Sequence, residues 1–339
     1  MPHPHAISPR LSSHTLPWPP NWDAIFGAHR PLILEIGFGR GAFLAHLART
    51  YPDHHVIGVE ISNRSLEATE RLIAREALGN VRLIHAMAET ALAHLFQPAS
   101  LSQIHLNFPD PWFKTRHSHR RIMRRAMIDW MVSRLAPAGM FYLATDIRAY
   151  AEMSAALLAE TPALANTLPA PFVHDLPGRV VTKYEATARQ EGRDCHYFAY
   201  CRTEMPVPHL PVIEELAMPH AVIHSPLSLD ALRDAFADHV RAQVHEGDTH
   251  VHLIDVYRGA DSLLVEAAVS EATIDQRIAI LILRRWREGQ AGDYTIQLST
   301  LGHPRSTQGI HRAVRLLVER LTALHPESRV LHHKLSEST

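Results

Sequence analysis

Short apolar runs alternate with amphipathic segments along residues 31–160, and this alternation constrains the fold of the 339-residue chain more than any other feature. Five runs predict buried parallel strands, at residues 31–36, 55–60, 80–84, 103–107 and 140–145. Helical periodicity marks the segments that separate or follow them, at residues 41–50, 65–78, 120–135 and 149–160. Two more strands are predicted near residues 179–181 and 196–202. The pattern predicts a doubly wound α/β sheet with ligands at the carboxyl ends of its strands.

The pattern changes after residue 203. Residues 204–226 contain five prolines and little periodicity, which is typical of a linker. Beyond it we predict an antiparallel α+β module, with helices at 229–244 and 309–324 and strands at 251–257, 262–269, 277–286 and 294–300. The chain therefore divides into a flexible N-terminal arm (1–30), an α/β domain (31–203), the linker (204–226) and an accessory module (227–339). Three aromatic residues of the arm, Trp18, Trp22 and Phe26, can dock on the α/β domain.

Composition limits the class of protein. The net charge of -1 excludes a polycation, so contacts with nucleic acid must come from local patches. Cys195 and Cys201 make no disulfide framework, and the 26 histidines show no metal-ligand spacing, so we expect no metal. With no signal peptide and no apolar run near the roughly 18 residues of a membrane helix, we expect a soluble cytoplasmic protein without a membrane partner. The oligomeric state, a homo-oligomer included, is left open.

Three glycines, Gly37, Gly39 and Gly41, lie where the first strand meets the first helix, and Glu35 precedes them. Their G-x-G-x-G spacing differs from the G-x-G-x-x-G of dinucleotide sites. The Glu35 carboxylate would repel a pyrophosphate but can neutralise the cationic groups of S-adenosylmethionine. Glu60 ends the second strand, where an acid accepts hydrogen bonds from ribose hydroxyls, although a solvated strand end is the alternative. Together these residues favour S-adenosylmethionine as the cofactor.

A second motif surrounds Asp110, which lies between Pro109 and Pro111 and is followed by Trp112. The two prolines stiffen the backbone and exclude a helix or a central strand. An acid on a stiff loop beside an aromatic ring suits a site that grips a nucleic-acid base, although a Pro-rich surface turn is the alternative. Whether Trp112 stacks on the base or packs internally is left open.

Six cations follow within twelve residues, and the interpretation is contact with an RNA backbone. They are Lys114, Arg116, Arg120, Arg121, Arg124 and Arg125. On the predicted helix, residues 117, 120, 121 and 124 share one face. A solvated helix face is the alternative.

With these motifs assembled, the chain resembles the tRNA (guanine-N7-)-methyltransferase family of the bacterial TrmB type over about residues 30–203. The resemblance rests on F-P-D-P-W-x-K-x-R-H at 108–117, the glycine loop, Ala144-Thr145-Asp146 and Thr182-Lys183-Tyr184-Glu185. It implies a class I, Rossmann-like methyltransferase fold and transfer of a methyl group from S-adenosylmethionine to N7 of guanine 46 in the tRNA variable loop.

The resemblance also implies roles for individual residues. The residues expected to bind the cofactor are Glu35, Gly37, Gly39, Gly41, Glu60 and Asp110. Asp110 is also the expected catalytic residue. The residues expected to bind tRNA, including the arginines identified above, are Lys114, Arg116, Arg120, Arg121, Asp146, Thr182, Lys183, Tyr184 and Glu185.

The chain departs from the family at two positions. Ala86 stands where the family has an acidic or amide residue near the adenine, so adenine recognition would use backbone groups or Glu89. Tyr184 replaces a phenylalanine. Two alternative functions stay open: a methyltransferase acting on another RNA or a small molecule, and a non-catalytic RNA-binding protein with a degenerate cofactor pocket. Cofactor titration separates the second from the enzymes.

The accessory module carries one basic-aromatic cluster, Arg284-Arg285-Trp286-Arg287, at a predicted strand end. The cluster can stack on RNA, or its charge can keep a sheet edge soluble.

Overall fold

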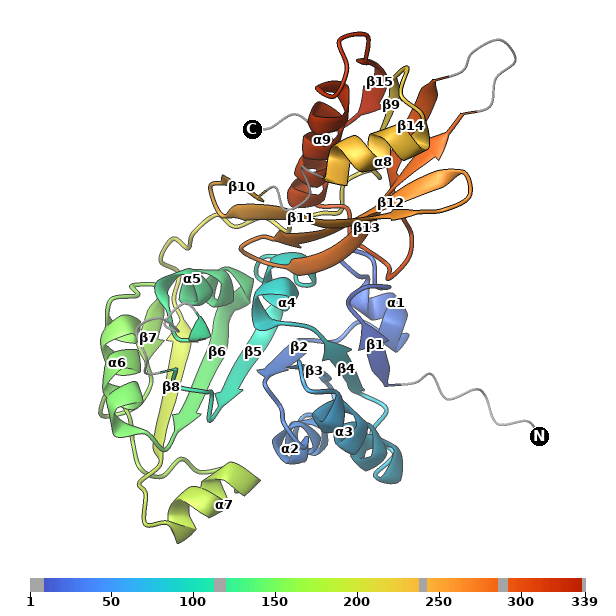
Figure 1. Cartoon of the computed structure of the whole chain (residues 1–339). Helices are drawn as coiled ribbons and strands as arrows, with labels where there is room; N and C mark the ends of the chain where they lie inside the picture. Colours follow the sequence, from blue (N-terminus) through green and yellow to red (C-terminus); the bar gives the residue numbers. More distant parts are fainter. Residues whose placement is uncertain (1–8, 113–119, 238–242, 286–291, 337–339) are drawn as a thin grey trace, which may run out of the picture. The chain divides into compact units, whose positions relative to one another are not determined.

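The computed structural model describes residues 9–112, 120–237, 243–285 and 292–336. The chain forms two compact units, Met1–Ile213 and Glu214–Thr339 (Figure 1). Each unit has its own sheet and its own core. None of the helices in the described ranges is long and apolar enough to cross a membrane.

The sheet of the first unit has the strand order β1-β4-β3-β2-β5-β6-β8-β7 among the described residues. Its strands are β1 (Arg10–Ser12), β2 (Leu32–Ile36), β3 (His55–Glu60), β4 (Val81–His85), β5 (Leu101–Asn107), β6 (Leu135–Thr145), β7 (Leu164–Asn166) and β8 (His196–Arg202). The strands from β1 to β6 pair in parallel, and β8 is antiparallel to both neighbours. The predicted doubly wound sheet is confirmed.

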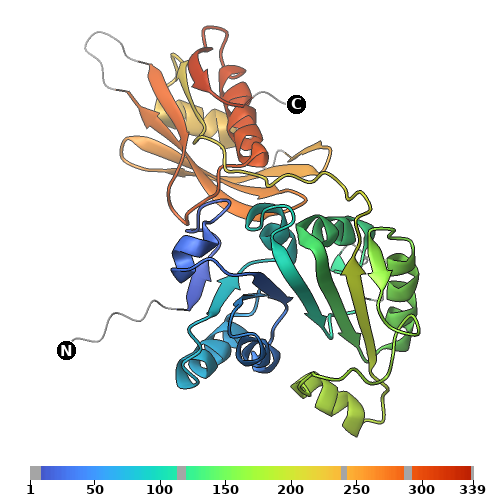
Figure 2. The ribbon, with the colours of Figure 1, turned by 180° about the vertical axis from the view of Figure 1, so that it is seen from behind.

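Helices connect these strands because their apolar residues recur at helical spacing. They are α1 (Trp22–Phe26), α2 (Ala42–Thr50), α3 (Asn63–Arg75), α4 (Ala88–His94), α5 (Arg125–Arg134), α6 (Arg148–Ala159) and α7 (Lys183–Gln190). α2 and α3 share one core with β2, β3 and β4. α7 lies beyond the carboxyl ends of β5 and β6, as the two opposite views show (Figures 1 and 2).

The centre of the sheet contains a topological switch point. β2 pairs with β3 on one side and with β5 on the other, so the strand order runs in opposite directions from this pair. A crevice forms at the carboxyl ends of two such strands, and ligands of doubly wound sheets bind there. In this chain those ends are Ile36 and Asn107.

The N-terminal segment docks on the first unit through its aromatic residues, as expected, and it also adds a strand. Residues 10–12 form β1, which pairs in parallel with β4. Trp18 and Trp22 are both buried, and Trp22 Nε1 donates a hydrogen bond of 3.0 Å to the carbonyl of Leu95. Burial of these rings ties the segment to the first unit from residue 9 onward.

Two predictions in the first unit are wrong. α5 begins at Arg125 and not at residue 120, because Arg124 has an extended backbone (φ -144°, ψ 157°). Residues 120, 121 and 124 therefore do not share a helix face. Residues 179–181 form no strand; they lie in the segment before α7.

The second unit is an antiparallel sheet with the order β10-β11-β12-β13-β14-β9-β15 within the described ranges. Its strands are β9 (His220–His224), β10 (Gln243–Glu246), β11 (Thr249–Arg258), β12 (Ser262–Ser270), β13 (Asp275–Arg284), β14 (Asp293–Leu298) and β15 (Arg329–Lys334). Alternate residues are buried along β12 and β13, so one face of each meets the core. α8 (Leu229–Ala237) and α9 (Gln308–Thr322) contribute to that core. The predicted α+β module is confirmed, with α8 ending before residue 244.

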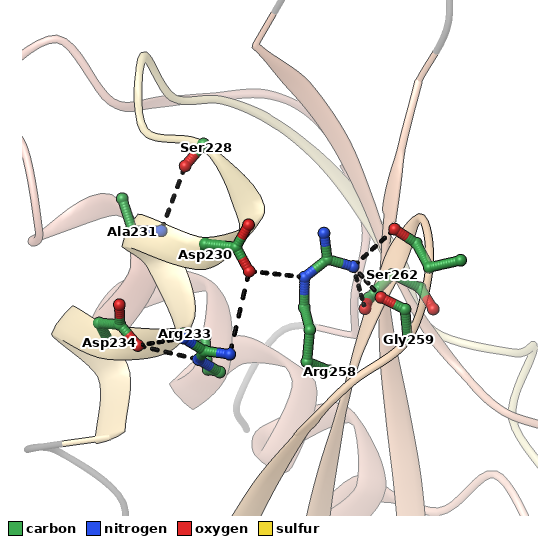
Figure 3. A network of polar contacts seen from close by, with 9 residues as sticks. Ser228, Asp230, Ala231, Arg233, Asp234, Arg258, Gly259 and Ser262 are labelled. Atoms are coloured by element: carbon green, nitrogen blue, oxygen red, sulfur yellow. Dashed lines mark hydrogen bonds and ion pairs between the residues drawn. The ribbon is translucent and has the colours of Figure 1, made fainter.

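Polar contacts fix α8 against the sheet (Figure 3). Ser228 accepts a hydrogen bond of 3.2 Å from the backbone N–H of Ala231, which starts the helix. Arg258, the last residue of β11, donates from Nε to Asp230 of α8 at 2.9 Å. It also donates to the carbonyl of Ala260 at 2.7 Å.

The predicted linker is bonded to both units. Arg134, which is fully buried, donates to the carbonyls of Leu210 and Pro211, and His94 donates to the carbonyl of Ile213 at 2.8 Å. From Glu215 onward the chain is bonded to the second unit: Glu215 pairs with Arg305 at 3.2 Å, and Ala217 accepts from Ser306. Residues 220–224, also predicted as linker, form β9.

Candidate functional site

A cavity of about 420 Å³ opens at the switch point, where β2 and β5 end. The glycine loop, the start of α3, Asn107–Phe108 and the start of α7 surround it. Several residues predicted from the sequence line it: Glu35, Gly37, Gly39, Thr182, Lys183 and Tyr184. Gly41, Glu60, Asp110, Arg120, Arg121, Asp146 and Glu185 do not.

Glu35 is the buried acid of this cavity, with only 1% of its surface exposed. Its Oε1 accepts a hydrogen bond of 2.9 Å from Asn107 Nδ2, whereas its Oε2 has no partner. Burial raises the pKa of Glu35 to about 7, although the Asn107 hydrogen bond and the nearby Arg179 both oppose the rise. A buried oxygen without a partner is costly, so this one suits a hydrogen-bond donor from a ligand.

Arg179 supports this arrangement, and the sequence analysis gave it no functional role. Its Nη2 donates to Asn107 Oδ1 at 2.6 Å, which turns the amide nitrogen of Asn107 toward Glu35. Its guanidinium lies over the rings of Phe43 and Tyr197, at 4.6 Å and 5.1 Å from their centroids. No periodicity or motif marks residue 179, because its partner is defined only by the folded chain.

The glycine loop requires glycine for two reasons. Gly37, Gly39 and Gly41 all have left-handed backbones, with φ of 73°, 55° and 76°. A Cβ on Gly41 would also lie 2.3 Å from the side chain of Thr69 on α3. Glu60 holds the loop from the other side, since its Oε2 accepts from the backbone N–H of Gly39 at 3.0 Å.

Glu60 also receives hydrogen bonds from the strand end that follows it. Its Oε1 accepts from the backbone N–H groups of Ile61 and Ser62, at 2.9 Å and 3.0 Å. The carboxylate therefore orders the loop and the start of α3. If Glu60 also binds a ribose, as predicted, it would have to accept those hydrogen bonds with the lone pairs that these backbone N–H groups do not use.

The loop around Asp110 is as stiff as the prolines predict. Phe108 and Trp112 have left-handed backbones, with φ of 51° and 42°, which non-glycine residues seldom adopt. The backbone N–H of Phe108 donates to the carbonyl of Ala144 at 2.8 Å. Asp110 itself is exposed.

Two of the predicted tRNA-binding arginines contact this loop. Arg121 Nε donates to the carbonyls of Pro111 and Trp112, at 3.1 Å each. The Arg120 guanidinium lies 5.2 Å from the centroid of the Trp112 ring. In the structure both side chains therefore hold the loop. Lys114 and Arg116 lie outside the described residues.

The remaining cations of this run have internal partners. Arg124 pairs with Glu89 at 2.9 Å, which also occupies the acid proposed for adenine recognition. Arg125 donates to Thr161 Oγ1 at 2.9 Å. The predicted basic helix face is therefore absent from the described part of this segment.

The residues of the segment Thr182–Glu185 have two roles: some stabilise α7 and its surroundings, and some line the cavity. Thr182 accepts from the backbone N–H of Glu185 at 3.1 Å and caps α7. The buried Glu185 accepts from the Tyr197 hydroxyl at 2.8 Å. Lys183 and Tyr184 are exposed at the cavity. Asp146, at the end of β6, pairs with Arg193.

Near the ends of β3 and β4 the structure offers apolar surface. Ala86 is buried, whereas Ile61 and Met87 are 65% and 44% exposed. Exposed apolar side chains at a ligand-binding edge of a sheet can hold a flat ring by contact area rather than by a hydrogen bond. No group of possible metal ligands is present among the described residues.

Comparisons with known proteins agree with this geometry. The model of the family described as "Putative methyltransferase" matches residues 29–198. A tRNA (guanine-N(7)-)-methyltransferase of Thermus thermophilus is 34% identical over 308 residues, which cover 90% of this chain and 94% of that protein. The protein of the same name from Burkholderia cenocepacia is 41% identical over 179 residues, which cover 53% of this chain and 70% of that protein.

The two relatives match different lengths of this chain. The Thermus match leaves a tenth of this chain uncovered, so it must extend into the second unit. The 179-residue Burkholderia match is shorter than the first unit alone. Among solved structures, the 16S rRNA methyltransferase KamB aligns with 54% of this chain and 92% of its own, with a TM-score of 0.42 and 16% identity.

Proposed function

Because the chain belongs to the tRNA (guanine-N7-)-methyltransferase family, we propose that it transfers a methyl group from S-adenosylmethionine to N7 of a guanine in tRNA. Its first unit has the class I methyltransferase fold. The observation that carries the proposal is the unpartnered Oε2 of Glu35 in a cavity at the switch point of that sheet. The target that we propose is guanine 46 of the variable loop, and the cytoplasm is the proposed location.

The residues at this edge of the sheet fit the cofactor. Glu35 Oε2 would accept a hydrogen bond from the cationic amino group of the methionine part, which favours an ionised carboxylate. Ile61 and Met87 would pack against the adenine, in place of the acid or amide that Ala86 lacks. Glu60 would use its remaining lone pairs for the ribose. When bound, S-adenosylmethionine supplies an electrophilic methyl group on a sulfonium centre.

Methyl transfer to guanine N7 requires little proton transfer by the protein. Guanine N7 carries a free lone pair and no proton, so its methylation needs no general base. The protein has to orient the guanine and stabilise the positive charge that develops on its ring. Asp110 is the carboxylate proposed for this role, because a stiff loop presents it to solvent. The contact of Trp112 with Arg120 supports a packing role for that ring.

The test is to locate the methyl group. The full chain would be incubated with labelled S-adenosylmethionine and an unmodified tRNA transcript, and N7-methylguanine would be mapped by chain cleavage at the modified base. A transcript with adenine at position 46 is the matched control. We expect label in the first transcript and none in the second. Methylation of another base, or equal labelling of both transcripts, contradicts the proposed target, and no labelling of tRNA contradicts the activity.

A further inference from the structure

We propose that four cations around the cavity, Arg40, Arg64, Arg71 and Lys183, bind phosphates of the tRNA next to the target guanosine. We call these four side chains the cationic rim. The inference rests on the proposed function and adds a substrate-binding surface to it. Lys183 was already expected to bind tRNA, and Arg40, Arg64 and Arg71 are additional to the residues that the sequence singled out.

The cationic rim is assembled from three separate parts of the chain. Arg40 belongs to the glycine loop, Arg64 and Arg71 to α3, and Lys183 is the first residue of α7. All four side chains line the same cavity, and all four are exposed. On α3, Arg64 and Arg71 are two turns apart with the small Ala68 between them, so both reach the cavity from one helix face.

The charge of the rim has no counter-ion among the described residues. No ion pair or hydrogen bond to a described carboxylate involves any of the four, and Glu35 is the one acid among the residues that line the cavity. Other arginines nearby do have partners: Arg49 pairs with Glu76, and Arg124 with Glu89. Four unneutralised cations around one cavity create a local positive potential, although the whole chain has a net charge of -1.

The backbone that carries three of the rim cations is held in place before any ligand arrives. Thr69 Oγ1 donates to the carbonyl of Gly39 at 3.2 Å, and Gly41 touches the same side chain, so α3 is fastened to the glycine loop. Ser62 accepts from the backbone N–H of Ser65 at 3.3 Å and fixes the start of α3. A preformed set of donors loses less conformational entropy on binding than a flexible one.

The arrangement favours a polyanion over the cofactor. S-adenosylmethionine carries a single carboxylate, which needs at most one or two of the four cations. Arg64 and Arg71 start about 10 Å apart along the helix axis, so an extended anion with several phosphates can contact both. Tyr184, which is 65% exposed, adds an aromatic ring over Gly39, where a base or ribose can pack.

The test uses the full chain with Arg64→Gln and Arg71→Gln combined. Each single variant, Arg64→Gln and Arg71→Gln, is also compared with Arg75→Gln, which removes one charge from the same helix outside the cavity, where Arg75 pairs with Glu76 at 3.7 Å. The measurements are tRNA affinity across a salt series, kcat and KM for tRNA, and S-adenosylmethionine affinity without RNA. A double variant with lysine at both positions tests whether charge is sufficient.

For the double glutamine variant we expect about tenfold weaker tRNA binding near physiological salt, and a salt slope shallower by about one to two. The kinetic loss should fall on KM for tRNA, whereas cofactor affinity should equal that of the wild type. The control should match the wild type, and the lysine variant should recover most of the binding. Thermal unfolding of each variant separates lost contacts from lost folding.

Two results would overturn the inference. Unchanged tRNA affinity and salt slope would show that the rim does not bind phosphates. A loss confined to S-adenosylmethionine affinity would assign the rim to the cofactor carboxylate instead. Failure of the proposed function is distinguishable, because a wild-type protein that does not methylate guanine N7 would still reveal through its tRNA affinity whether the rim binds RNA.

Discussion

Each unit has a glutamate near the end of a strand, fully buried in the first unit and partly buried in the second, and the two carboxylates differ in what they bind. Glu271 follows β12 in the second unit, where it accepts from the Thr307 hydroxyl and from the backbone N–H of Gly309 at 2.8 Å. Glu35 in the first unit is bonded on one oxygen only. Burial raises the pKa of both groups. The comparison supports the proposal that the acid with both oxygens paired serves the fold, whereas the acid with an unpaired oxygen at a cavity serves a ligand.

A third carboxylate, Asp110, extends the comparison and should give the largest effect. Its side chain is exposed, and it has no hydrogen-bond or ion-pair partner among the described residues. Asp110→Asn keeps the shape of the side chain and removes its charge. We expect kcat to fall about 10²-fold or more, the size of loss seen when comparable electrostatic groups are removed. Single-turnover methylation of tRNA measures the effect, with the melting temperature as the folding control. A near-wild-type rate would remove Asp110 from the catalytic role.

Glu35→Gln tests the ligand half of the comparison directly. The amide of the variant still offers Asn107 an oxygen but cannot neutralise a cationic amino group. We expect S-adenosylmethionine affinity to fall by about 10- to 100-fold, the range of a lost charge-assisted hydrogen bond. Calorimetric titration without RNA measures it, and unchanged affinity would contradict the cofactor assignment.

Without a bound ligand, the Glu35→Gln variant should also be more stable than the wild type above pH 7. Folding raises the pKa of Glu35 from 4.5 to about 7, so the folded protein holds a proton that the unfolded chain releases. Stability from this group is present below pH 4.5 and is lost as pH rises through 7. The full penalty is about 3 kcal/mol, and Glu35→Gln should remove much of it. Chemical unfolding at pH 8 measures the gain.

Cofactor binding should depend on pH through the same group. Ionised Glu35 is the form that receives a cation, so affinity should fall by up to about tenfold per unit as the pH drops below 7. Affinity should also fall above about pH 8, where an α-amino group loses its proton, so the test concerns the acid side of the profile. Glu35→Gln should flatten this dependence. Equal pH profiles for the two proteins would show that another group titrates.

Glu271→Gln should have the smallest effect and should act on stability alone. The amide keeps one acceptor and loses the second, so one of the two donors loses its bond, which should cost about 1 kcal/mol. Removal of a carboxylate whose pKa is raised by burial offsets part of this cost. Denaturant unfolding measures it, and cofactor affinity should match that of the wild type. A loss of cofactor affinity would break the contrast between the two acids.

The sequence predicted the strands that are buried on both faces, because such strands are continuous apolar runs. It missed β15, whose six residues are all exposed, and β1, which has three residues and no pattern of its own. The glycine loop and Glu35 were predictable from local chemistry. Arg179 and the three arginines of the cationic rim were not, because their roles depend on contacts between residues far apart in the chain. Lys183 was expected only through the family resemblance.

The bonded linker defines where this protein can be divided for production. A fragment ending near residue 202 would strip the Leu210 and Pro211 carbonyls from Arg134, leaving a buried guanidinium short of acceptors. A fragment ending at Ile213 keeps those acceptors, and one starting at Glu214 keeps the ion pair to Arg305. Limited proteolysis, followed by mass spectrometry of the products, would show whether the backbone between these anchors is the first to be cleaved.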